Sequence, residues 1–285
     1  MDKPISIIIP ALNEEGEIGE TIRKIMEVFD STERKFEVVV VDDGSTDDTG
    51  KRAEEAGATV IRHPANAGYG SALLSGIAEA KYELIGIIDG DGSYKAEDFH
   101  KLLEFSDDFD MVIGARTGVH YRGSFLKKPA REAFHWLAQY ITGEKIPDVN
   151  SGMRIFKKKA LENISHILCR GFSFSTTLTL NLLWGGCFVK FVPISYHKRV
   201  GRSHVRYLRD TLRTGQIMVG TLIYFNPIKI MLPLVLLSFF ISLIFFLSWI
   251  FFHKNMWLLI SVISFFSCLH LFGIGLIMDR IRMNK

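Results

Sequence analysis

Two aspartates separated by one glycine, Asp89 and Asp91, follow directly after the apolar run 84–88. The run predicts a buried strand. Two carboxylates at the end of a strand can bind one hard divalent cation, which prefers oxygen ligands and often bridges phosphates. Gly90 and Gly92 let the backbone turn sharply and approach a ligand closely. Because Asp and Gly also form ordinary surface turns, these four residues alone leave a metal site and a plain turn open.

The elements that must position these aspartates alternate between strand and helix patterns over the first 115 residues. Apolar strands separated by helices imply a mostly parallel, Rossmann-like sheet that is covered on both faces, so we expect an α/β fold. Ligands of such sheets bind beyond the carboxyl ends of the strands. The expected strands are 5–9, 36–41, 59–62, 84–88 and 111–114, and the expected helices are 15–29, 47–56, 68–80 and 96–105.

Three of these strand ends carry polar residues: PALNE at 10–14, DDGS at 42–45 and DGD at 89–91. We expect them to converge on one edge of the sheet and to carry the chemistry. The glycines at 68–70 could also direct amides at an anion. Later elements are less regular: a helix at 130–141, a turn and short strand within 148–156, a helix at 172–184, and one or two strands within 187–196 broken at Pro193.

The net charge of +3 conceals an uneven distribution along the chain. Residues 1–113 hold 11 Lys and Arg against 25 Asp and Glu, whereas residues 114–285 hold 23 against 6. The acidic part suits metal binding. The basic part, next to apolar helices, suits anionic lipid head groups or a phosphate-bearing substrate.

Two long segments near the C-terminus, 230–252 and 255–278, contain no Asp, Glu, Lys or Arg. About 20 apolar residues in a helix cross a bilayer core, so both segments predict transmembrane helices, with a pair of buried core helices as the alternative. Lys and Arg lie on the outer sides of this pair, and the linker at 253–255 holds one Lys. The positive-inside rule then predicts a membrane protein with two spans and both flanks in the cytoplasm.

The segment before the first span mixes apolar and basic residues, which suits a helix in the membrane interface; a plain amphipathic packing helix is the alternative. The sequence therefore predicts an α/β domain at 1–202, an interfacial region at 203–229, and spans at 230–252 and 255–278. The first apolar run, 5–9, is too short for the core of a signal peptide, so we expect none here.

Seven strings occur in order along the chain: SIIIPALNEE, VVVVDDGSTDDT, NAGYGSALLSGI, IIDGDGSY, DMVIGAR, NSGMRIF and RVGRSH. Together they resemble glycosyltransferase family 2, and within it the dolichyl- and undecaprenyl-phosphate mannosyl- and glucosyltransferases. The resemblance implies a GT-A fold, a nucleotide-diphosphate sugar donor, Mg²⁺ or Mn²⁺ as cofactor, a polyprenyl phosphate acceptor and a lipid membrane, and no nucleic-acid partner.

The resemblance also implies roles for single positions. On the donor side it indicates Pro10, Ala11, Asn13, Glu14, Asp43, Asp89, Arg199, Arg202 and Ser203. On the acceptor side it indicates Arg116, Arg131, Ser151 and Arg154. Asp91, and with it Asp89, would bind the metal, and the catalytic set would be Asp89, Asp91, Arg116 and Arg131. Two positions depart from the family's usual pattern: Ser93 stands where many relatives have Gln, and His204 where the closing loop has Lys.

The nucleophile decides what such a site needs. A lipid monophosphate has a second pKa of about 6 and is mostly dianionic at neutral pH. It needs positioning and partial neutralisation by arginines rather than a general base. We therefore expect an inverting single displacement on the cytoplasmic face. Transfer to a lipid hydroxyl, which needs a base, is the enzymatic alternative. A non-catalytic membrane-anchored protein that binds nucleotide sugars is the other.

Overall fold

The computed structural model describes residues 3–118, 128–162, 164–171, 173–197 and 207–283. At 128–131, 133–134, 141, 166 and 207–214 it describes the backbone alone. The chain forms two compact units, Met1–Gly215 and Gln216–Lys285, which are described separately below.

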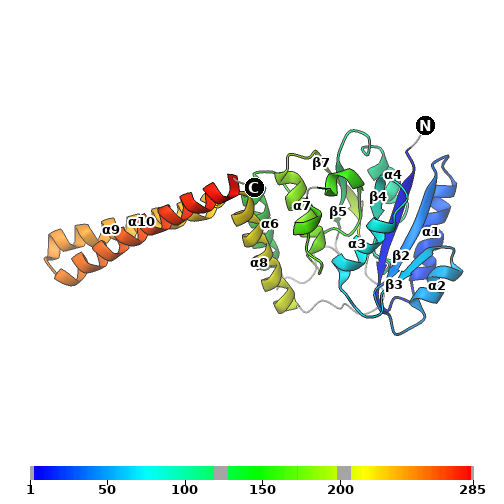
Figure 1. The fold of residues 1–285 in the computed structure, drawn as a ribbon, viewed down its shortest axis with the longest axis horizontal. Helices are drawn as coiled ribbons and strands as arrows, with labels where there is room; N and C mark the ends of the chain where they lie inside the picture. The colour runs from blue at the N-terminus through cyan, green and yellow to red at the C-terminus, as the bar shows by residue number, and fades with distance from the viewer. Residues whose placement is uncertain (1–2, 119–127, 163, 172, 198–206, 284–285) are drawn as a thin grey trace. The chain divides into compact units, whose positions relative to one another are not determined.

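The first unit is built on a seven-stranded sheet, as far as the described residues go, with the order β3-β2-β1-β4-β6-β5-β7 (Figure 1). All neighbouring strands pair in parallel except β6, which is antiparallel to both β4 and β5. The strands are β1 (Ile5–Ala11), β2 (Phe36–Asp42), β3 (Thr59–Arg62), β4 (Leu84–Ile87), β5 (Met111–Thr117), β6 (Arg154–Lys157) and β7 (Val189–Ser195).

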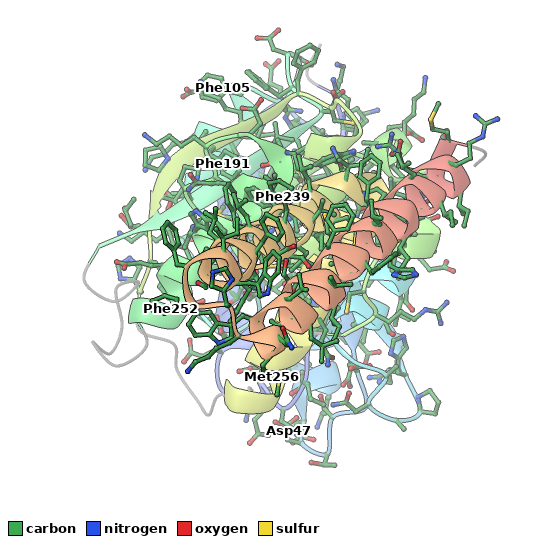
Figure 2. The ribbon with its side chains drawn as sticks, turned by 90° about the vertical axis from the view of Figure 1, so that its left-hand side faces the viewer. Asp47, Phe105, Phe191, Phe239, Phe252 and Met256 are labelled. Atoms are coloured by element: carbon green, nitrogen blue, oxygen red, sulfur yellow. The ribbon has the colours of Figure 1, made fainter. Side chains whose placement is uncertain are left out.

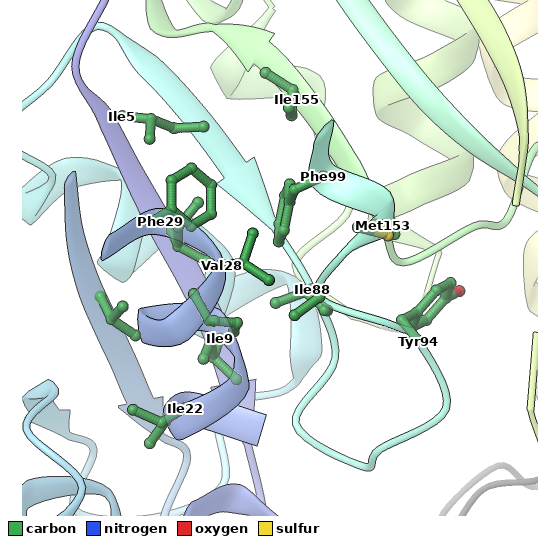
Figure 3. Close-up of a cluster of buried hydrophobic side chains, with 14 of the residues drawn as sticks. Ile5, Ile9, Ile22, Val28, Phe29, Ile88, Tyr94, Phe99, Met153 and Ile155 are labelled. Atoms are coloured by element: carbon green, nitrogen blue, oxygen red, sulfur yellow. The ribbon is translucent and has the colours of Figure 1, made fainter. Parts of the chain in front are cut away.

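Helices cover both faces of the sheet because alternate side chains of each strand point to opposite faces. Ile7 of β1 lies in one apolar cluster with residues of α1 and α4, and Ile8 lies in a second cluster with residues of α3 and α7. In the first cluster Phe29 and Phe99 lie 5.6 Å apart, measured between ring centroids (Figure 3). The helices of this unit are α1 (Ile18–Asp30), α2 (Thr49–Glu55), α3 (Tyr69–Glu79), α4 (Asp98–Leu103), α6 (Lys128–Thr142) and α7 (Phe174–Trp184).

The antiparallel strand β6 changes which residues meet at the carboxyl edge of the sheet. Arg154, the first residue of β6, pairs with Ile87 of β4 and with Ile113 of β5. Because β6 runs against its neighbours, the segment 148–153 before it arrives at the edge where β4 and β5 end. This segment therefore lies beside the residues that follow β4.

The expected break at Pro193 is wrong, since β7 runs unbroken through this residue. Pro193 pairs with Ala115 of β5, and β7 is an edge strand of the sheet. A proline cannot donate a backbone hydrogen bond, but an edge strand has no second neighbour that needs one.

The second unit holds two long apolar helices, α9 (Ile228–Phe252) and α10 (Asn255–Met283), which are long and apolar enough to cross a membrane. They follow α8 (Tyr207–Phe225), which crosses the boundary between the two units. His253, in the left-handed conformation, ends α9. Inside the pair, the hydroxyls of Ser242 and Ser261 each donate to the other residue's carbonyl, both at 2.9 Å.

The outward faces of this hairpin are apolar. Phe239, Phe252 and Met256 are 42%, 63% and 65% exposed, and Figure 2 shows their positions on the two helices. Such faces suit lipid rather than water, because a soluble surface rarely exposes so large a contiguous apolar area.

Candidate active site at the carboxyl edge of the sheet

The loops that follow β1 and β2 are held together by side chains. Asn13 has a positive φ of 54°, which Asn tolerates better than most residues. Its side-chain oxygen accepts a hydrogen bond from the backbone amide of Thr46 at 2.8 Å, and its backbone amide donates to Ser45 Oγ at 3.0 Å. The amide of Glu14 donates to Thr49 Oγ1 at 2.8 Å. Two of the expected donor-side residues thus form the junction between the first two strand ends.

Asp43 is buried, and its carboxylate is used inside the protein. It accepts the amides of Ala67 and Gly68 at 2.9 and 2.8 Å, and it lies 2.7 Å from Nδ1 of His63. The amide of Asp43 donates to the carbonyl of Ala11 at the end of β1. Asp43 therefore anchors the segment before α3 to the sheet edge. Its expected contact with a nucleotide base stays a prediction, as do the donor-side roles of Pro10 and Ala11, both buried in β1.

Backbone groups around the glycines at 68–70, which could direct amides at an anion, form hydrogen bonds inside the protein. The amide of Gly68 donates to Asp43, and the amide of Ser71 donates to the carbonyl of Arg170 at 2.8 Å. A Cβ at Gly70 would lie 2.7 Å from the carbonyl carbon of Arg170, so this position needs glycine for close packing. These backbone groups fasten α3 to the segment before α7.

Asp89 follows β4 and is fixed by a tyrosine. The hydroxyl of Tyr69 donates to Oδ1 of Asp89 at 2.8 Å. Burial and then the negative charge of Asp89 raise the pKa of Tyr69 well above its usual value, so the phenol keeps the proton that it donates.

Asp91 is 7% exposed and is oriented by Ser93. The amide of Ser93 donates to Oδ1 of Asp91 at 3.0 Å, and its hydroxyl donates to the same oxygen. Ser93, where many relatives of the family have Gln, thus supports Asp91 through a short turn. In this arrangement the Ser93 hydroxyl is engaged in its hydrogen bond to the Asp91 carboxylate.

The donor set of Asp89 and Asp91 fits Mg²⁺ or Mn²⁺. Carboxylate oxygens are hard ligands, which these ions prefer. Among the described residues, no group of three His, Cys, Asp or Glu side chains could hold a metal ion. The protein would therefore supply part of a coordination shell, and a substrate diphosphate and water would supply the rest, as is usual for Mg²⁺.

Arg116, at the end of β5, forms a bidentate ion pair with Asp148. Its Nε and Nη2 donate to the two carboxylate oxygens at 2.7 and 3.0 Å, and its amide donates to Oδ2 at 3.1 Å. Its guanidinium also lies 5.2 Å from the ring centroid of Tyr196. Burial works to raise the pKa of Asp148, but Arg116 outweighs it and holds this pKa below its usual value.

Ser151 and Arg154, expected on the acceptor side, lie inside the protein and are both 0% exposed. The hydroxyl of Ser151 donates to the carbonyl of Gly114 at 2.6 Å. The guanidinium of Arg154 donates to the carbonyls of Ser151 and Ser175 and to the hydroxyl of Thr179. In this arrangement both side chains are engaged inside the protein, and their acceptor-side roles stay predictions.

Several expected residues lie outside the described part of the structure. Arg199, Arg202, Ser203 and His204 fall in the segment 198–206, and only the backbone of Arg131 is described, within α6. His197, the last described residue before this segment, donates its amide to the carbonyl of Ser93 at 3.0 Å. The roles of these five residues stay predictions.

Sequence reasoning missed Tyr69, Tyr94, Asp148 and Tyr196. The hydroxyl of Tyr94 accepts the amide of Gly152 at 2.7 Å, and the rings of Tyr94 and Tyr196 lie 5.2 Å apart edge to face. Tyr94 could have been found from the sequence, because it lies only three residues after Asp91. Asp148 gave none, because its partner Arg116 is distant in sequence.

Comparison with known proteins places this site in a family. The family model "Glycosyl transferase family 2" matches residues 6–165, more than half of the chain. The low-salt glycan biosynthesis hexosyltransferase Agl6 of Haloferax volcanii is 31% identical over 221 residues, 75% of this chain and 53% of that protein. An undecaprenyl-phosphate 4-deoxy-4-formamido-L-arabinose transferase of Edwardsiella ictaluri is 27% identical over 57% of this chain and 51% of that protein. The matched part thus spans about half the length of these two relatives.

A solved structure shares the fold. Glucosyl-3-phosphoglycerate synthase of Mycobacterium tuberculosis superposes with a TM-score of 0.64 at 20% identity, covering 77% of this chain and 80% of that one. The expected α/β class is thereby confirmed: the sheet is mostly parallel and GT-A-like, and two apolar C-terminal helices follow it. Because the family model matches more than half of its residues, this chain belongs to glycosyl transferase family 2.

Proposed function

We propose that this chain is a membrane-bound inverting glycosyltransferase that moves one sugar from a nucleotide-diphosphate sugar to a polyprenyl phosphate. The observation that carries the proposal is the placement of Asp89 and Asp91 at the carboxyl edge of a GT-A-like sheet, in a chain that also holds two helices of membrane-spanning length. The printed name of the E. ictaluri relative, an undecaprenyl-phosphate transferase, supports this acceptor class.

The donor half of the proposed site consists of the three strand ends that the loop contacts hold together. Structures of the M. tuberculosis synthase contain UDP with Mn²⁺ and UDP with Mg²⁺, which supports a divalent cation beside a nucleoside diphosphate here. When bound, such a cation stabilises the negative charge that develops on the leaving diphosphate. Asp91, oriented by Ser93, and Asp89, held by Tyr69, would be its protein ligands.

The acceptor half needs positive charge rather than a base. A phosphate monoester is already mostly dianionic near pH 7, because its second pKa is about 6. Its oxygen attacks the anomeric carbon from the face opposite the diphosphate, the bond to the diphosphate breaks, and the configuration inverts. Arg116 is engaged by Asp148, so we assign most of the binding of the acceptor phosphate to Arg131 and keep Arg199 and Arg202 for the donor diphosphate.

The orientation in the membrane follows from charge. Lys and Arg flank both outer ends of the hairpin, and the short linker holds one Lys. Under the positive-inside rule this distribution supports a site on the cytoplasmic face.

Asp91→Asn tests the metal-dependent part of this proposal. Purified protein would be incubated with a panel of labelled nucleotide sugars and a short polyprenyl phosphate, and the labelled lipid extracted. We expect the variant to lose at least about 100-fold in kcat/KM, since the metal contributes several kcal/mol to the transition state. Asp48→Asn, an exposed carboxylate near the same edge, is the matched control and should leave transfer unchanged.

Metal removal and a change of acceptor complete the test. Chelator should abolish transfer, and added Mn²⁺ or Mg²⁺ should restore it. Full activity after chelation, or in Asp91→Asn, would rule out the metal mechanism. Transfer to a polyprenol in place of its phosphate would instead support a glycolipid synthase with a general base.

A further inference from the structure

The carboxylate of Asp89 has two close protein neighbours. The hydroxyl of Tyr69, at the start of α3, donates to Oδ1 at 2.8 Å. The backbone of Gly152, from the segment before β6, also packs against this carboxylate: a Cβ at this position would stand 2.7 Å from Cγ of Asp89 and in contact with Oδ2. Both neighbours therefore restrict how the carboxylate can turn.

Gly152 is itself held in place. Its amide donates to the hydroxyl of Tyr94 at 2.7 Å, and the neighbouring Ser151 is tied to the carbonyl of Gly114. Tyr94 and Met153 belong to the first apolar cluster, at one end of it in Figure 3. The segment that limits Asp89 is thus fixed to both the core and β5, so it cannot yield easily to a larger side chain.

Arg154 adds a buried positive charge to this arrangement. Arg154 is 0% exposed, and its Nε has no hydrogen-bond partner among the residues that the structure describes. Burial lowers the pKa of Arg154, and the negative charges of Asp148 and Asp89 are among those that oppose this shift. An arginine stays protonated in proteins, so its charge favours ionised carboxylates at this edge of the sheet.

We propose that Tyr69 and Gly152 are positioning residues that restrict the orientation of the Asp89 carboxylate and so prepare it to serve a divalent cation together with Asp91. The inference rests on the proposed function. It adds that two protein groups orient Asp89: the Tyr69 hydroxyl, which donates to it, and Gly152, where a side chain would collide with it. Outer contacts that orient a metal-binding carboxylate typically contribute 10- to 100-fold to metal affinity or activity.

Two conservative variants of the full-length protein in detergent test this. Tyr69→Phe removes only the donating hydroxyl and keeps the packed ring. Gly152→Ala adds one methyl group against Asp89. Tyr82→Phe, a tyrosine just before β4 at the opposite end of the strands, and Gly16→Ala, where nothing lies within 4 Å of the added carbon, are the matched controls. Binding of Mn²⁺ alone is measured by the loss of the free-ion EPR signal, and thermal melting reports folding.

We expect Tyr69→Phe to weaken Mn²⁺ binding about 10-fold, and to raise the Mn²⁺ concentration for half-maximal transfer by the same factor with little change in melting temperature. Gly152→Ala should weaken binding further, and both controls should match the parent. Unchanged Mn²⁺ binding in both test variants, with an active parent, would overturn this inference and leave the proposed function standing. A parent that neither binds Mn²⁺ nor transfers sugar would overturn both.

Discussion

At the scale of single residues, buried charged side chains organise the site. Arg116 and Asp148 are 17% and 2% exposed at their side chains and pair through two hydrogen bonds. Removing one member of a buried pair leaves the other without compensation, which usually costs several kcal/mol. The pair therefore holds the end of β5 to the segment before β6. We expect its loss to lower the free energy of unfolding more than it weakens substrate binding.

Asp148→Asn should lower the free energy of unfolding of the first unit by about 3 kcal/mol at pH 7, because it leaves the Arg116 guanidinium without its counter-charge. The pKa of Asp148 is lowered in the folded protein. Its contribution is thus complete above the unfolded value of about 3.9 and is lost as pH falls through the folded value. We expect the gap between parent and variant to stay constant from pH 7 to 5 and to narrow below about pH 4.

Urea unfolding of the detergent-purified protein, followed by tryptophan fluorescence at several pH values, measures this gap. Asp107→Asn is the control, because Asp107 pairs with Lys3 on the surface, where both side chains are mostly exposed. It should shift the unfolding midpoint very little. A gap of the same size for both variants would contradict the role given to the buried pair.

At the scale of elements, periodicity predicted most of the first unit. Alternation of apolar strands and helices is a local pattern, so strands such as Phe36–Asp42 and helices such as Ile18–Asp30 were expected to within a few residues. The antiparallel direction of β6 was not predicted, because strand direction depends on which neighbours the strand finds in the sheet. Pro193 was misjudged for the same reason, since only the finished sheet makes β7 an edge strand.

The part of the candidate site that is contiguous in sequence could be predicted. The part that the fold brings together from distant segments could not. Asp89 and Asp91 follow a strand and stand out by type and spacing. The groups that orient them come from separate elements: Tyr69 from α3 and Gly152 from the segment before β6. The buried position of Arg154 also depends on the direction of β6, whereas its expected acceptor-side role came from the family resemblance and stays a prediction.

The packing of α3 on the sheet gives an element-scale prediction. A Cβ at Gly76 would lie 2.5 Å from Cγ2 of Ile8 and 3.0 Å from Cγ2 of Val41. Gly76→Ala should therefore destabilise the first unit by about 2 kcal/mol through overpacking, although alanine favours a helix. Urea unfolding measures the change, with Gly16→Ala as the control in open space. Greater stability than the parent would show that α3 moves away from β1 and β2 without cost.

At the scale of the whole molecule, the acidic front and the basic rear correspond to different tasks. Residues 1–113 carry the aspartates at the sheet edge, whereas 19 of the 23 Lys and Arg of the remainder lie between 116 and 229 and three follow the apolar hairpin. A chain that joins a nucleotide sugar to a lipid phosphate needs both: carboxylates for a cation, and positive charge for phosphate and anionic lipid. The two helices of the hairpin are largely unburied within the structure and are long and apolar enough to cross a membrane.

The orientation of the hairpin can be tested in cells with single cysteines. In a chain whose Cys169, Cys187 and Cys268 are replaced by Ser and which still transfers sugar, Lys254→Cys lies in the hairpin linker and Lys51→Cys on the exposed side of α2. A maleimide that cannot cross membranes should label the first in intact cells and the second only after permeabilisation, because under the positive-inside rule the flanking Lys and Arg favour a cytoplasmic position for both ends of the hairpin. The unsubstituted background sets the baseline. Labelling of Lys51→Cys in intact cells would place the sheet edge outside, away from nucleotide sugars, and would contradict the proposed direction of transfer.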